Sequence, residues 1–84
     1  MKHASEIALD QLEPLLARVR ALPGLTEKKR GVFYRKSRAF LHFHEAPKGL
    51  FGDVRAADDR DFDRFDVTAS GDALIAAAEA RLRA

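Results

Sequence analysis

Cysteine is absent from this chain of 84 residues, and tryptophan is absent as well. Without cysteine the protein has no disulfide, no zinc-thiolate site, no iron-sulfur cluster and no cysteine nucleophile. No stretch approaches the roughly 18 apolar residues of a membrane span, and the first residues lack the continuous apolar segment of a signal peptide. These absences predict a cytoplasmic protein that is stabilised by packing and that has no membrane partner.

The residues that are present have the proportions of an ordinary globular domain. Hydrophobic residues make up 46% of the chain and charged residues 33%, so neither a disordered nor a fibrous class is indicated. A chain of this length has room for one hydrophobic core. We therefore expect a single domain over residues 1–84, with a frayed start over residues 1–10.

Charge is divided unevenly along the chain, although the formal net charge is only +2. From Arg18 to Arg38, eight basic residues accompany one acidic residue, a balance of +7. From Glu45 to Glu79, nine acidic residues accompany four basic residues, a balance of −5. Such asymmetry predicts attraction to polyanions at one end of the molecule, unless folding brings the two halves together and cancels the field.

Helical spacing of apolar residues appears near both ends of the chain. Its first stripe runs from Leu12 to Leu22, and Pro23-Gly24 then ends the helix. Pro14 lacks a backbone donor, so either the helix starts near Leu12 and Pro14 lies in its first turn, or a longer helix from Ser5 kinks there. We expect the first arrangement. A second, alanine-rich helix is predicted after possible N-cap residues, which are Thr68, Ser70 and Asp72.

Between the helices the pattern changes to short runs of aromatic and β-branched residues, which is typical of strands. We expect strands at Val32–Lys36, Ala39–Glu45, Leu50–Ala56 and Phe62–Val67, with residues 25–31 as a basic connector. The predicted fold is α+β, in the order α-β-β-β-β-α. It consists of an antiparallel four-stranded meander with two helices packed on one face.

Alternation along the second predicted strand assigns side chains to the two faces of the sheet. Ala39, Leu41 and Phe43 are the expected core residues. Phe40, His42 and His44 would then lie on the opposite face, which is neither a clean core nor an ordinary charged surface. That face, or a free strand edge, is a candidate for protein interaction or for a homodimer.

A cationic hairpin tip is the first candidate site. Arginines there can fork to phosphate oxygens, and neighbouring aromatics can stack on bases. This predicts a binding module for nucleic acid or for an acidic protein, and the alternative is a solvated loop that prevents edge association. The candidate residues are Arg35, Lys36 and Arg38, which flank Ser37 at the tip, together with Lys28, Lys29 and Arg30, which could widen the basic patch.

Two histidines at alternate strand positions are the second candidate site. His42 and His44 would present both rings on one face, which can supply two ligands to a metal ion. Asp53 on the neighbouring strand is the expected third ligand, and half-buried surface histidines are the alternative. General-base use of either histidine would need a partner and a pocket. The sequence contains no catalytic motif, so we predict no catalytic residue and no cofactor.

The run LPGLTEKKRGVFYRKSRAFLHF resembles the opening of the MmcQ/YjbR-like family, in a shortened form. Its shared features are a helix that ends in Leu-Pro-Gly and an aromatic hairpin that carries Lys36 and Phe40. The resemblance covers Leu15 to Phe43. It implies a frataxin-like α+β fold and DNA binding through wing-like hairpins, with Arg35, Lys36 and Arg38 at the wing positions.

Overall fold

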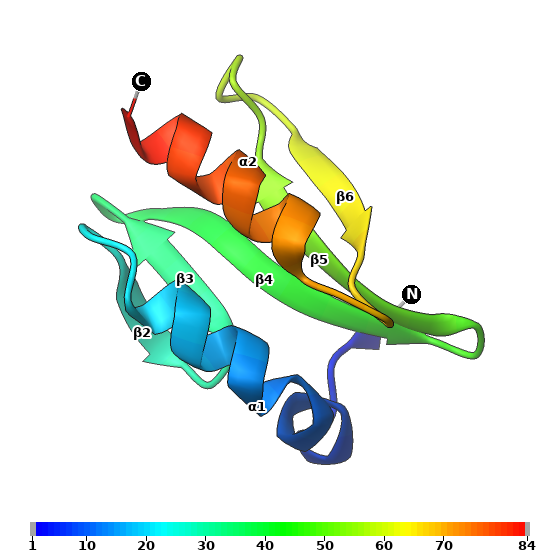
Figure 1. Ribbon diagram of the computed structural model, residues 1–84. Helices are drawn as coiled ribbons and strands as arrows, with labels where there is room; N and C mark the ends of the chain where they lie inside the picture. Colours follow the sequence, from blue (N-terminus) through cyan, green and yellow to red (C-terminus); the bar gives the residue numbers. More distant parts are fainter. Residues whose placement is uncertain (1, 84) are drawn as a thin grey trace.

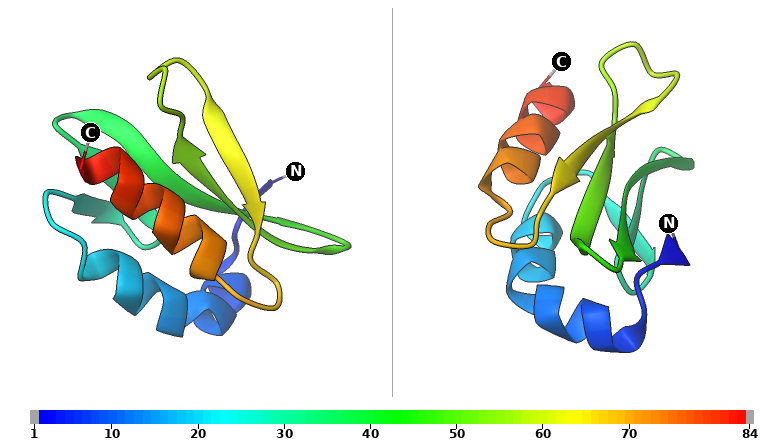
Figure 2. Two further views of the ribbon diagram at one scale, coloured as in Figure 1. Left: turned by 45° about the horizontal axis from the view of Figure 1, so that its top comes forward. Right: turned by 90° about the vertical axis from the view of Figure 1, so that its right-hand side faces the viewer.

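The computed structural model describes residues 2–83, which form two helices and one antiparallel sheet (Figure 1). The elements are β1 (Lys2–His3), α1 (Glu6–Arg20), β2 (Thr26–Lys29), β3 (Val32–Arg35), β4 (Arg38–Ala46), β5 (Gly49–Arg55), β6 (Phe62–Asp66) and α2 (Asp72–Arg83). Strands β2 to β6 lie side by side in chain order, and β1 pairs with β4. Both helices cover the same face of the sheet, whereas the opposite face carries no helix within residues 2–83 (Figure 2).

The α+β class, the antiparallel meander and the two helices on one face are confirmed. The four predicted strands correspond to β3, β4, β5 and β6, with ends within one residue of the prediction. Two further strands extend the sheet. Strand β2 lies inside the predicted basic connector, and β1 lies in the segment expected to fray.

Helix α1 begins at Glu6, so the prediction of a start near Leu12 is wrong. Ser5 caps the helix, because its hydroxyl accepts a hydrogen bond from the backbone N–H of Ala8. Pro14 lies inside the helix, where it lacks a backbone donor and crowds the preceding turn. The helix axis changes direction along its length (Figure 1). The longer, kinked helix is therefore the one that forms.

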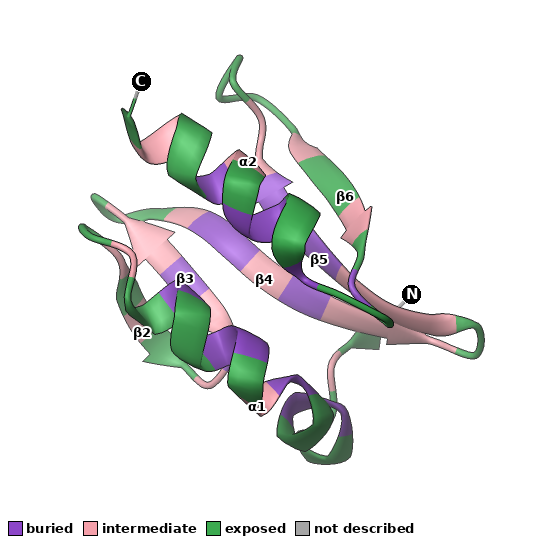
Figure 3. Ribbon diagram, in the orientation of Figure 1, coloured by how far each residue is buried: buried purple, intermediate pink, exposed green. Residues whose placement is uncertain are grey.

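The core lies between the helices and the covered face of the sheet, where the buried residues face one another (Figure 3). Leu16 and Val19 of α1, Leu74 of α2 and Leu41 of β4 are completely buried. Gly52 lets α2 approach β5 closely, since an added Cβ would lie 2.2 Å from the Cδ1 atom of Leu74. No helix in residues 2–83 has the length and apolarity needed to cross a membrane.

A β-bulge at Phe40 changes the predicted division of faces. Phe33 pairs with Leu41 and Tyr34 with Ala39, so Phe40 is an extra residue on β4. Its ring is 3% exposed and belongs to the hydrophobic core. The prediction that Phe40 shares a face with His42 and His44 is therefore wrong, because simple alternation does not continue through a bulge.

Candidate functional site

The β3–β4 hairpin turns through two residues in the left-handed region. Lys36 has φ 51° and Ser37 has φ 73°, which is the two-residue geometry that matches the twist of paired strands. Both residues are exposed. This tight turn places the cationic hairpin tip at one end of the molecule (Figure 1).

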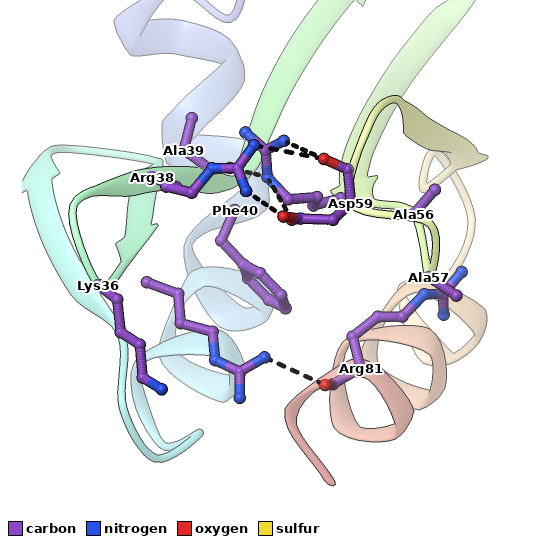
Figure 4. A pocket seen from close by; sticks show the side chains of 10 residues that line it. Lys36, Arg38, Ala39, Phe40, Ala56, Ala57, Asp59 and Arg81 are labelled. Atoms are coloured by element: carbon purple, nitrogen blue, oxygen red, sulfur yellow. Dashed lines mark hydrogen bonds and ion pairs between the residues drawn. The ribbon is translucent and has the colours of Figure 1, made fainter. Parts of the chain in front are cut away.

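A hollow of about 360 Å³ lies beside this tip (Figure 4). It is bordered by the β3–β4 hairpin, the end of β5, the following loop and the last turn of α2. Its lining residues are Arg35, Lys36, Arg38, Ala39, Phe40, Arg55, Ala56, Ala57, Asp59 and Arg81. Of these described residues five are cationic and one is acidic, a balance of +4. We call this feature the cationic hollow.

Hydrogen bonds hold most of the hollow's arginines in place. Arg38 pairs with the carboxylate of Asp59, and the Nη1 atom of Arg55 donates to the Asp59 carbonyl at 3.2 Å. The Nε atom of Arg55 also donates to the carbonyl of Ala39 at 2.7 Å. Arg35 donates to the carbonyl of Arg81 at 3.2 Å, at the C-terminal end of α2. The guanidinium groups are thus oriented before any ligand arrives.

Phe40 forms an apolar part of the hollow. Its ring lies between the Arg38–Asp59 pair and the α2 segment that carries Arg81 (Figure 4). Ala39, Ala56 and Ala57 also line the hollow and leave space because their side chains are short. A low-polarity wall strengthens the electrostatic attraction between the arginines and an anion.

The other three predicted basic residues lie elsewhere. Lys28 and Lys29 are on β2, near the β2–β3 turn, at the opposite end of β3 from Lys36. Three strand steps, roughly 10 Å, separate the ends of β3. Lys28 lies 4.5 Å from the ring centre of Tyr34, a cation–π geometry. The structure therefore brings Arg35, Lys36 and Arg38 together, but it does not join Lys28, Lys29 and Arg30 to the cationic hollow.

Arg30 is surrounded by carboxylates of α1. It contacts Glu6, Asp10 and Glu13 at 2.8 to 3.1 Å, and hydrogen bonds to Glu13 and Asp10 raise its pKa. Arg20 contacts Glu13 at 2.5 Å and Glu27 at 2.7 Å. We call these residues the α1 ion-pair network. Although Arg30 lies in the most basic segment of the sequence, its charge is locally neutralised.

The second predicted site forms a cluster on the open face of the sheet. His42 is the cross-strand partner of Asp53, and one possible ligand atom from each of His42, His44 and Asp53 lies within 4.8 Å of the others. The Nε2 atom of His44 lies 3.2 Å from the Oδ2 atom of Asp53, and Nδ1 of His42 lies 4.0 Å from the same oxygen. The predicted third position therefore lies beside both histidines.

Burial and charge act in opposite directions on this histidine cluster. Burial lowers the pKa of His42, and the Asp53 carboxylate opposes that effect. Burial also disfavours ionisation of Asp53, but two hydrogen bonds from Arg64, at 2.8 and 2.9 Å, hold its pKa below the ordinary value. The Nδ1 atoms of His42 and His44 are buried without a hydrogen-bond partner in the described part of the chain. Each such atom costs about 1–3 kcal/mol.

Sequence reasoning missed three residues of these sites. Arg55 and Arg81 join the cationic hollow from the end of β5 and from α2, and no local pattern connects them with the hairpin. His3 lies beside the histidine cluster, with its ring centre 5.2 Å from that of His44. The position of His3 beside His44 could be recognised only after β1 was known to pair with β4.

Comparisons of the chain with family models, with curated proteins and with solved structures find no match. The resemblance to the MmcQ/YjbR-like family therefore stays a prediction. Self-association and binding to an acidic protein stay predictions as well. The local geometry of the cationic hollow and of the histidine cluster provides the basis for the functional proposals.

Proposed function

We propose that this protein is a binding module whose cationic hollow engages phosphate groups of nucleic acid. The observation that carries the proposal is that five cationic residues line one hollow, whereas only two described carboxylates pair with them, Asp59 in the lining and Asp63 beside Arg81. These cations come from the β3–β4 hairpin, from the end of β5 and from α2. Their convergence favours an anionic ligand, because like charges held close together repel one another until a counter-charge binds.

The planar shape of the arginine side chain matches a phosphate group better than it matches a small spherical anion. Its planar guanidinium group donates two parallel hydrogen bonds to a pair of phosphate oxygens. Arg35, Arg38 and Arg55 are already oriented by hydrogen bonds to carbonyl oxygens and to Asp59. Such preorganisation reduces the conformational entropy that binding would otherwise cost.

Several exposed cations favour a polymer over a single small anion. Lys36 lies at the exposed hairpin tip, and Lys28 and Lys29 are exposed on the edge strand β2. A nucleic-acid backbone that seats one phosphate in the hollow could reach further lysines with neighbouring phosphates. The family resemblance implies wing-like positions at Arg35, Lys36 and Arg38, which belong to the same hairpin tip.

Fluorescence anisotropy with labelled single-stranded and duplex DNA of random sequence tests the proposal. We expect binding at low salt, with an affinity that falls steeply as salt rises because counterions are released. Lys36→Glu should weaken binding by about tenfold, and replacing one phosphate-contacting cation should reduce the salt slope by about 1. Lys36 is exposed, so this variant should fold normally.

Lys48→Glu provides the matched control. Lys48 is exposed in the β4–β5 turn and does not line the cationic hollow. The two variants change the net charge equally, so a purely global charge effect would weaken both to the same degree. Equal losses would contradict a specific site, and absence of binding by the wild-type protein at low salt would reject the proposed function.

A further inference from the structure

The two-residue strand β1 brings a third histidine to the open face of the sheet. His3 is the cross-strand partner of His44, and Lys2 is the partner of Glu45. Partners in register project to the same face. The ring of His3 stacks on His44 at a centroid distance of 5.2 Å and lies 6.2 Å from that of His42. Three imidazoles from two strands thus gather on the face of the sheet that carries Asp53.

We infer that His3, His42, His44 and Asp53 form a binding site for a divalent transition-metal ion. Imidazole nitrogen and carboxylate oxygen are the ligand types that Zn²⁺ and Co²⁺ accept in proteins. This site is distinct from the cationic hollow and does not depend on the proposed function. It also gives a role to the buried Nδ1 atom of His42, which has no hydrogen-bond partner among the described residues.

The ligand spacing supports the assignment. In a tetrahedral site with bonds of about 2.0–2.1 Å, neighbouring ligand atoms lie about 3.3 Å apart. The His44 Nε2 to Asp53 Oδ2 distance of 3.2 Å already matches this value. The His42 Nδ1 to Asp53 Oδ2 distance is 4.0 Å, so the His42 ring would need to move inward by less than about 1 Å.

The surroundings hold these ligands on rigid strands. His42 and His44 lie on β4 and Asp53 on β5, within a continuous ladder of paired residues. The ring of Phe62 packs on that of His42 at a centroid distance of 4.7 Å. The Asp53 side chain is only 6% exposed. The side chains of the expected ligands therefore lie close to a metal-binding arrangement before a metal ion binds.

His3 is the adjustable fourth ligand. It is exposed, and its ring lies flat against His44, with an interplanar angle of 26°. Turning this ring toward Asp53 would give up little packing. Because β1 contains only two residues and pairs only with β4, a metal ion bound by His3 would fasten this segment to the sheet.

Arg64 competes with the metal ion. Its Nε and Nη2 atoms donate to the two oxygens of Asp53, so Arg64 occupies one lone pair of each oxygen, and a metal ion would use a remaining lone pair of Oδ2. The Arg64 side chain is 48% exposed and can swing into solvent. Its positive charge opposes the metal ion, so its removal should strengthen metal binding.

The first test uses untagged wild-type protein, because a purification tag would itself bind metal. We expect Co²⁺ to produce the visible absorption of a tetrahedral complex and Zn²⁺ to displace it. Saturating Zn²⁺ should raise Tm by about 5–10 °C. The chain contains three histidines, so paramagnetic Co²⁺ should shift the imidazole resonances of all three. An unchanged spectrum and an unchanged Tm would overturn the inference without any variant.

Three variants then distinguish the roles of the ligands. His44→Gln should abolish the tetrahedral Co²⁺ spectrum, and His3→Gln should weaken Zn²⁺ binding by at least about tenfold. Arg64→Gln should strengthen Zn²⁺ binding by at least about fivefold. Asp61→Asn, in the exposed β5–β6 loop, is the acidic control and should change nothing. Weaker binding by Arg64→Gln, or loss of affinity in Asp61→Asn equal to that in His44→Gln, would contradict the site.

Discussion

The cationic hollow and the α1 ion-pair network contain similar arginines but different numbers of carboxylates. Arg30 has three carboxylates within 3.1 Å. In the cationic hollow, by contrast, five cationic residues meet two carboxylates: Asp59 pairs with Arg38 and Arg55, and Asp63 of β6 pairs with Arg81. Arg30 of the network and three cations of the hollow, Arg35, Lys36 and Arg38, come from the same basic stretch of sequence. The difference shows that the net charge of a sequence segment does not predict the electrostatic field around it, because acidic residues of another element can neutralise its basic residues.

Helical periodicity explains why the charge of Arg30 is compensated in the α1 network. Glu6, Asp10 and Glu13 follow one another at intervals of four and three residues, so they lie on one side of α1. That side faces Arg30, at the β2–β3 turn. The cations of the hollow are met instead by two carboxylates, Asp59 of the β5–β6 loop and Asp63 of β6. Three predictions test this contrast, beginning with the largest expected effect.

Phe40→Ala should disrupt the cationic hollow by removing the apolar part of its lining, and it should leave the α1 network in place. Phe40 is 3% exposed and belongs both to the core and to the hollow. Removing its ring should lower the free energy of unfolding by about 3–5 kcal/mol, as measured by urea denaturation. Ile7→Ala is the apolar control, because Ile7 is 74% exposed. Equal losses in the two variants would contradict the buried position of Phe40.

Asp59→Asn should increase the difference in net charge between the cationic hollow and the α1 ion-pair network. Asn tolerates the left-handed backbone of this position, where φ is 63°, so the fold should persist. Loss of the carboxylate frees Arg38 and removes a negative charge from the hollow. Nucleic-acid affinity should therefore rise by about fivefold, measured by fluorescence anisotropy.

Asp58→Asn is the matched control for that change. Asp58 is adjacent and exposed, does not line the hollow, and accepts a hydrogen bond from the backbone N–H of Arg60 that Asn can also accept. It should leave affinity almost unchanged. A similar increase in both variants would mean that general charge, and not the position of Asp59, controls binding.

Glu27→Gln gives the smallest expected effect and tests the α1 network. A hydrogen bond from Arg20 lowers the pKa of Glu27, and burial partly opposes this effect. Because its pKa is lower in the folded state, Glu27 stabilises the fold above about pH 4.5, and this contribution is lost as pH falls through the folded-state pKa. At pH 7 the variant should be less stable by about 0.5 kcal/mol.

Urea denaturation at pH 7 and at pH 3 measures this difference. The wild-type protein and Glu27→Gln should converge at the lower pH, because the carboxylate is then increasingly protonated. Gln retains an acceptor for the backbone N–H of Gly31, which bonds Glu27 at 3.0 Å. A stability gap that is unchanged or larger at pH 3 would contradict the ion-pair role.

Much of the fold follows from local sequence patterns. The two-residue alternation in β4 correctly predicted that Leu41 and Phe43 are buried, but it was wrong for Ala39, which lies beyond the bulge and is only partly buried. The bulge at Phe40 was missed, because it depends on the register between β3 and β4 and not on the sequence of β4 alone. Strand β2 was missed because Thr26–Lys29 is polar and lies at the sheet edge, where the apolar signal of a strand is weak.

The candidate sites were predicted where their residues are neighbours in the chain. The spacing of His42 and His44 placed both on one face, and the strand order placed Asp53 beside them. The neutralisation of Arg30 could not be predicted, because it depends on how α1 packs against the β2–β3 turn. The contributions of Arg81 and His3 likewise require contacts between distant parts of the chain.

NMR titration of the ¹⁵N-labelled protein with a short single-stranded oligonucleotide tests the central contrast most directly. We predict that backbone amide shifts change mainly at Arg35 to Phe40 and at Ala56 to Asp59, and only weakly at Arg30 and Gly31. The largest changes at Arg30 and Gly31, with the hairpin tip unaffected, would contradict the assignment of the cationic hollow as the phosphate-binding centre.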